Sequence, residues 1–119
     1  MLFETLRKIV EETPGATGAI LMGFDGIAVM QYLAKGYEKV DIESIAMEFS
    51  FRFIELQKAA RALELGEVSD ITVKAETATV LCRVLGEEYF AAVVLHDSGY
   101  FGKGRWLLRN NSTGLTSEL

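Results

Sequence analysis

The stretch GAILMGFDGIAVM, residues 18–30, decides the fold. It places Phe24-Asp25-Gly26 between two short apolar runs. An Asp-Gly pair between strand-like runs favours a tight β-hairpin, because glycine adopts positive φ without a steric penalty. We therefore expect one strand over residues 16–23, a second over residues 27–33, and a hairpin between them.

Helical patterns lie on both sides of this hairpin. Before it, residues 2–13 carry apolar side chains at helical spacing, and Pro14-Gly15 ends the pattern. After it, a polar loop leads to Asp41, a residue type favoured at a helix N-cap. The longest expected helix follows over residues 42–65, with Gly66 as its C-terminal stop.

The second half of the chain predicts three strands and a helix. The strands are expected over residues 69–76, 78–85 and 89–96, and the helix over residues 100–110, capped by Asp97 or Ser98. The order α-ββ-α-βββ-α predicts an α+β sandwich: a five-stranded antiparallel sheet with helices on both faces. Residues 1–111 form one domain in this interpretation, and the polar residues 112–119 are expected to be disordered.

Composition excludes several functional classes. The 119 residues carry 12 basic and 17 acidic side chains, a net charge of −5, with no basic cluster longer than Arg7-Lys8, which argues against nucleic-acid binding. No run approaches 18 apolar residues, so we expect no membrane insertion and a cytoplasmic protein. The mean hydropathy of +0.20 is high for a soluble protein, which hints that apolar surface is used on a partner.

Residues suited to catalysis are few. The only histidine, His96, is followed by Asp97 and Ser98, but adjacent residues at a strand-to-helix junction point in different directions. The only cysteine, Cys82, alternates with valines on a strand and is expected in the core. No Cys/His spacing fits a metal site, and Gly102-Lys103-Gly104 lacks the spacing of a phosphate-binding loop. We expect no catalytic residue, no metal and no cofactor, and we expect Gly102 and Gly104 to let the helix pack close to the sheet.

The long middle helix has two apolar faces. One stripe is expected to face the sheet: Ile42, Ile45, Ala46, Phe49, Phe53, Leu56, Ala60 and Leu63. Met47, Phe51 and Ile54 lie on the opposite side, and Lys58 continues their line. Either another helix of the chain covers these three side chains, or they contact a second subunit. Residues 69–76 are expected to form an edge strand, and a two-fold dimer would cover the strand and the patch together.

The only tryptophan lies outside the apolar stripe of the last helix. Arg105 and Arg109 project near Trp106, and this composition is typical of an interface hot spot. A lid over the sheet edge is the alternative interpretation.

The hairpin at residues 18–30, the long helix after a polar loop and the segment SGYFGKGRWLLR at residues 98–109 together resemble the Roadblock/dynein light chain family. Bacterial MglB-like regulators of small GTPases are the members that the chain resembles. The resemblance implies homodimers, or heterodimers with a paralogue, built through the middle helix and the third strand. Its dimer and partner-binding side would then comprise Met47, Phe51, Ile54, Lys58, Ile71 and Val73.

The resemblance also implies a function. Family members bind small Ras-like GTPases across the helix pair, and some accelerate GTP hydrolysis by positioning the GTPase's own catalytic groups. Here Glu43, Arg61 and Trp106 would be further partner contacts. The sequence thus predicts a non-enzymatic dimeric regulator or scaffold. Two alternatives remain open: a small-molecule sensor of the profilin-like or PAS-like kind, and a purely structural subunit.

Overall fold

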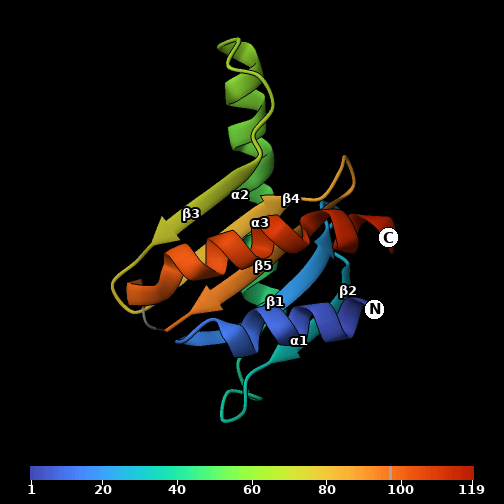
Figure 1. The fold of residues 1–119 in the computed structure, drawn as a ribbon. Coiled ribbons are helices and arrows are strands. Elements are labelled where there is room, and N and C mark those ends of the chain that lie inside the picture. The colour runs from blue at the N-terminus through green and yellow to red at the C-terminus, as the bar shows by residue number, and fades with distance from the viewer. Residues whose placement is uncertain (97) are drawn as a thin grey trace.

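A computed structural model describes residues 1–96 and 98–119. Its elements follow the expected order: α1 (Leu2–Glu12), β1 (Ala16–Gly23), β2 (Ala28–Leu33), α2 (Ile42–Ala62), β3 (Asp70–Lys74), β4 (Thr79–Val84), β5 (Tyr89–Leu95), a 3₁₀ turn η1 (Ser98–Tyr100) and α3 (Phe101–Ser117). The strands pair antiparallel in the order β2-β1-β5-β4-β3 (Figure 1). This confirms the predicted α+β sandwich with its five-stranded sheet.

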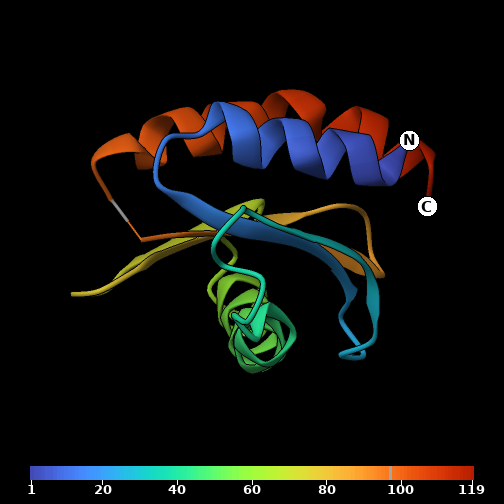
Figure 2. The ribbon, with the colours of Figure 1, turned by 90° about the horizontal axis from the view of Figure 1, so that it is seen from below.

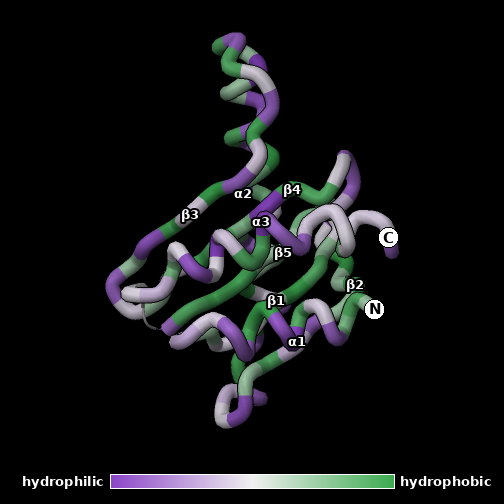
Figure 3. The backbone as a smooth tube through the Cα atoms, in the orientation of Figure 1, coloured by the Kyte–Doolittle hydropathy of each residue, from purple (hydrophilic) through white to green (hydrophobic). Residues whose placement is uncertain are grey.

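The helices form layers on both faces of the sheet. Helices α1 and α3 lie side by side on one face, and α2 lies on the other (Figure 2). Each face has its own apolar core, one centred on Leu6, Ile9 and Leu115, the other on Ile42, Phe53 and Phe90. Between these layers β1 is buried along its whole length, so its sequence is apolar apart from Thr17 and does not alternate (Figure 3).

The β1–β2 hairpin forms as predicted. Gly26 has φ +86°, the left-handed conformation that glycine tolerates, and Asp25 Oδ1 accepts the backbone N–H of Ile27 at 3.0 Å. Strand β2 begins at Ala28, one residue later than expected. The Asp-Gly turn therefore joins β1 to β2 as adjacent antiparallel strands.

Helix α2 begins as predicted and ends earlier than predicted. The Asp41 side chain accepts the backbone N–H of Ser44 at 3.1 Å and caps the first turn. The helix ends at Ala62, because Glu64 adopts φ +59° and the N–H of Leu65 bonds to the carbonyl of Ala60 at 2.8 Å. This is a Schellman motif with glutamate in the position that usually holds glycine. The prediction that Gly66 stops the helix is wrong.

Helix α3 is longer than expected. It runs to Ser117, and Leu115 is fully buried against α1 and the sheet, which anchors the last turns. The predicted helix end near residue 110 is therefore wrong, and so is the disorder expected for residues 112–119. The burial of Leu115 holds this otherwise polar end of the helix against the rest of the protein. Gly104 confirms its predicted role, since a Cβ there would lie 3.0 Å from Leu81 Cδ1. The same role predicted for Gly102 is wrong, because a Cβ there would meet no described atom within 4 Å. The expected cap from Asp97 or the Ser98 side chain lies outside the described residues.

Candidate interaction surface

Helix α2 extends well beyond the sheet that it covers. Its buried residues end at Phe53, whereas every residue from 54 to 65 is exposed or half-buried. The 21 residues of α2 span about 31 Å at 1.5 Å per residue, more than the sheet can cover. We call residues 54–68 the arm; it comprises the second half of α2 and the return towards β3 (Figure 1).

The arm carries apolar side chains that this chain leaves uncovered. The prediction that Leu56 and Leu63 face the sheet is wrong: Leu56 is half exposed, and Leu63 and Leu65 expose 69% and 74% of their surface. Leu56 and Leu63 continue the sheet-facing stripe of α2 past the point where the sheet ends, and Leu65 follows just after the helix. Hydrophobic residues therefore alternate with charged ones along a projecting element (Figure 3).

The apolar patch predicted on the back of α2 lies at the surface. Met47 exposes 38% and Phe51 49% of its surface, and Ile54 is half-buried. Because α1 and α3 occupy the opposite face of the sheet, neither of them covers the patch (Figure 2). The alternative that another helix of this chain covers these side chains is therefore wrong.

Strand β3 is an edge strand, as predicted. In the described part of the chain it pairs only with β4, so its outer backbone N–H and C=O groups face outwards. Ile71 and Val73 are half-buried and lie opposite Cys82 and Val80, whose side chains belong to the core beneath α2. Their apolar side chains therefore share a sheet face with α2. We call Met47, Phe51, Ile54, Lys58, Ile71 and Val73 together the α2–β3 surface.

The charged residues predicted around this surface have different environments. Glu43 and Lys58 are exposed on α2. Arg61 instead forms a forked ion pair within the arm, with Nε 3.1 Å from Glu67 Oε1 and Nη2 2.8 Å from Glu67 Oε2. This pair raises the pKa of Arg61 and lowers the pKa of Glu67. Arg61 is thus already engaged by its own chain.

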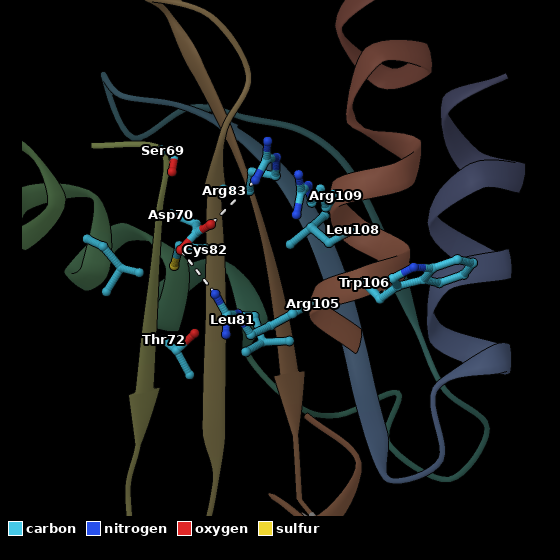
Figure 4. Close-up of a pocket in the computed structure, with 11 residues that line it drawn as sticks. Ser69, Asp70, Thr72, Leu81, Cys82, Arg83, Arg105, Trp106, Leu108 and Arg109 are labelled. Atoms are coloured by element: carbon cyan, nitrogen blue, oxygen red, sulfur yellow. Dashed lines mark hydrogen bonds and ion pairs between the residues drawn. The ribbon is translucent and has the colours of Figure 1, made fainter. Parts of the chain in front are cut away.

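Trp106 does not join the α2–β3 surface. It lies on α3, across the sheet, with 59% of its surface exposed and its ring turned away from the neighbouring arginines (Figure 4). Trp106 is therefore near Arg105 and Arg109 in the helix sequence, but its ring does not pack against their side chains.

Sequence reasoning missed a second feature, a groove of about 490 Å³ between α3 and strands β3 and β4. Arg83, Arg105 and Arg109 lie over this space, with Asp70 between the first two (Figure 4). Arg83 Nη1 is 3.4 Å from Asp70 Oδ2, and Arg105 Nη2 is 3.5 Å from Asp70 Oδ1. Only the strand register, which places Asp70 opposite Arg83, could have pointed to this cluster.

The groups considered for catalysis have structural surroundings. His96 Nδ1 lies 3.3 Å from Thr17 Oγ1, Nε2 lies 3.3 Å from the Tyr37 hydroxyl, and the His96 and Tyr37 rings stack with centroids 4.9 Å apart. Asp97 lies outside the described residues. Cys82 is buried, which raises its thiol pKa to about 12 and keeps the thiol protonated.

Two further kinds of site have no support in residues 1–96 and 98–119. In that part of the chain no three His, Cys, Asp or Glu side chains gather in a way that could hold a metal ion. None of the helices in the same ranges is both long and apolar enough to cross a membrane.

Comparison with solved structures assigns the family. MglC from Myxococcus xanthus is 32% identical, with 98% of this chain and 97% of that chain aligned and a TM-score of 0.69. An MglB with a tetrameric arrangement is 18% identical over 96% of this chain and 84% of that one, with a TM-score of 0.86. A Roadblock/LC7 domain from Streptomyces avermitilis is 18% identical over 96% and 97% of the two chains, with a TM-score of 0.74.

The chain belongs to the Roadblock-like family that contains MglB and MglC. Its identity to MglC, over nearly the full length of both chains, carries this assignment, and the less similar structures share the fold. No protein-family model and no curated protein matches the sequence.

Proposed function

We propose that this protein is a homodimeric, non-enzymatic regulator or scaffold that binds a small Ras-like GTPase across the paired α2 helices. In the dimer, two β3 edges pair to form one continuous sheet, and each arm lies against the partner subunit. The α2–β3 surface would contact both the second subunit and the GTPase.

The extension of α2 past its own sheet is the observation that carries this proposal. Leu56, Leu63 and Leu65 project on the arm without any sheet beneath them, while Phe51 and Met47 are exposed on the back of the helix. Contiguous exposed apolar side chains mark an interaction site. The unpaired outer edge of β3 lies next to them, and the apolar side chains of β3 are on the sheet face that α2 covers. A second copy would cover the apolar arm and the edge in one two-fold contact.

The tetrameric arrangement of a solved MglB supports self-association by this fold. A pair of α2 helices would form a rigid apolar platform with charged margins, to which Glu43 and Lys58 contribute one acidic and one basic group. A platform that contacts the switch region of a GTPase more tightly in one nucleotide state shifts the GTPase towards that state by differential affinity. Modulation of GTP hydrolysis would follow from the same preference.

A titration with a GTPase tests this proposal. A Ras-like GTPase from the same organism, loaded with a non-hydrolysable GTP analogue or with GDP, is titrated into the wild type, Phe51→Asp and Arg52→Asp. Burying an unpaired charge costs about 3–5 kcal/mol, so Phe51→Asp should weaken binding by at least about 100-fold. Arg52→Asp places the same side chain one residue away, at an exposed position off the patch. It lowers the net charge by two units, where Phe51→Asp lowers it by one, and should still change binding little. Equal binding by all three proteins would show that the GTPase does not use this face.

A further inference from the structure

The groove between α3 and strands β3 and β4 concentrates positive charge on an otherwise acidic protein. The chain has a net charge of −5, yet three arginines and a single carboxylate line this space. Helix α3 itself carries Lys103, Arg105 and Arg109 and has no acidic residue. This distribution is local, and it lies on the opposite sheet face from the α2–β3 surface.

The arginines of the groove are incompletely paired. Asp70 alone serves both Arg83 and Arg105, at the long distances of 3.4 and 3.5 Å. Arg83 Nε is buried and has no hydrogen-bond acceptor in the described part of the chain. Among the same residues, Arg109 has no carboxylate partner. Leaving a buried donor without an acceptor costs free energy. The guanidinium groups that an incoming anion can reach directly are those of Arg105 and Arg109, which are exposed. Guanidinium forks match carboxylate oxygens in two-pronged hydrogen bonds.

A fourth cation lies beyond the residues that line the groove. Lys74 lies on the same side of β3 as Asp70, and its ammonium nitrogen is 4.5 Å from the centre of the Phe101 ring at the start of α3. Lys74 lies four positions after Asp70 in the strand, which places their Cα atoms about 13 Å apart. A row of cations over this length suits a chain that carries several carboxylates better than it suits a single small anion.

We propose that this groove binds an acidic segment of a partner protein, whose carboxylates accept hydrogen bonds from Arg83, Arg105 and Arg109. The apolar floor, formed by Leu81 and Leu108, would contact the methylene groups of the acidic side chains. Asp70 occupies the arginines in the free protein and is displaced when the segment binds. The groove is complete within one chain, so this proposal does not depend on dimerisation or on a GTPase.

Calorimetric titration with a capped octaglutamate peptide tests the proposal at low ionic strength, where screening is weak. The expected result is saturable binding that weakens with added salt, with no binding of capped octaglutamine. Arg105→Gln and Arg109→Gln should each weaken binding by about tenfold. Asp70→Asn should tighten it several-fold, because Asp70 competes with the peptide for the same guanidinium groups.

Arg52→Gln is the matched control, since it removes one positive charge from an exposed position on the opposite face. When the comparison is repeated at about 0.15 M salt, where the Debye length is about 8 Å, it should leave the affinity within about twofold of the wild type, because charges beyond a Debye length are screened. Arg109→Gln removes no intramolecular ion pair among the described residues, so it should melt like the wild type and remain informative even if Arg83 variants unfold.

Three results would overturn the proposal. The first is the absence of binding of octaglutamate to the wild type. The second is a loss of affinity in Arg52→Gln equal to that in Arg105→Gln, which would indicate diffuse attraction to net charge. The third is inorganic phosphate binding as tightly as the peptide and displacing it, which would make the groove a site for a single oxyanion.

Discussion

Arg61 and Glu67 join the two sides of the arm: the guanidinium on the last turn of α2 holds the carboxylate on the returning chain through two contacts of 3.1 and 2.8 Å. Both side chains are largely exposed, so water screens the pair and it contributes little to stability. Its consequence is geometric, because it keeps the returning segment alongside the helix. The arm therefore projects as an ordered element with Leu63 and Leu65 at its tip.

Glu64 is expected to be a point of strain at that tip. Because non-glycine residues pay for left-handed backbone, Glu64→Gly should raise the free energy of unfolding by about 1 kcal/mol. Gly66 has φ +90°, so Gly66→Ala should lower it by about the same amount. Urea unfolding monitored by circular dichroism measures both. A Glu64→Gly variant less stable than the wild type would contradict the described helix end.

The close approach of α3 to the sheet predicts different outcomes for two glycines of one helix. A Cβ at Gly104 would lie 3.0 Å from Leu81 Cδ1 and 3.2 Å from Thr13 Cγ2, whereas a Cβ at Gly102 would have open space around it. Gly102→Ala should stabilise by about 0.5–1 kcal/mol through helix propensity. Gly104→Ala should be less stable than Gly102→Ala by about 1–3 kcal/mol because of overpacking. Equal thermal melting temperatures for the two variants would argue against this packing.

Tyr32→Phe tests the link between β2 and α1 through its pH dependence. The Tyr32 hydroxyl donates to Glu11 Oε2 at 2.9 Å; this bond, with help from Arg7, lowers the pKa of Glu11, and it raises the pKa of Tyr32. A lowered carboxyl pKa stabilises the fold above the unfolded pKa of about 4.3, and that stabilisation is lost as the pH falls through the folded value. A raised phenol pKa stabilises below about pH 10, and that stabilisation is lost as the pH rises through the folded value.

The wild type should therefore exceed Tyr32→Phe in unfolding free energy most between about pH 5 and 9, and the difference should shrink towards both extremes. Phenylalanine keeps the edge-to-face contact with Phe3, whose ring centre is 5.5 Å away, so the comparison isolates the hydroxyl. Urea unfolding across this pH range measures the difference. A constant difference at all pH values would exclude the titrating hydrogen bond.

Cys82 should be unreactive while the protein is folded. The thiol is 2% exposed, and burial raises its pKa to about 12, so little thiolate exists at neutral pH. A thiol-reactive dye at pH 8 should label the native protein far more slowly than the protein in urea. Equally rapid labelling in both conditions would mean that β4 opens readily or that the thiol is accessible.

Local sequence patterns predicted most of the fold. Asp25-Gly26 identified the hairpin, Asp41 identified the start of α2, and the single-sided pairing of β3 followed from its place at the end of the meander. Met47 and Phe51 are expected at the surface because a helix with apolar residues on two opposite sides can pack only one of those sides against the sheet. These features depend on residues close together in the chain.

Features that depend on tertiary contacts were missed. Leu56 and Leu63 continue the sheet-facing stripe of α2, and only the extent of the sheet leaves them uncovered. Leu115 seats the end of α3 through a contact with residues far away in sequence. Asp70 meets Arg83 and Arg105 because of strand register and helix placement, neither of which periodicity reveals.

The solution mass of the wild type, measured by light scattering at low micromolar concentration, tests the central claim most directly. A homodimer through the α2–β3 surface predicts about twice the 13.2 kDa of the chain. Phe51→Asp should shift that mass to a single chain while keeping the circular dichroism spectrum of the wild type, and Arg52→Asp should remain dimeric. A wild-type mass of one chain would contradict the account, as would a Phe51→Asp dimer as stable as the wild type.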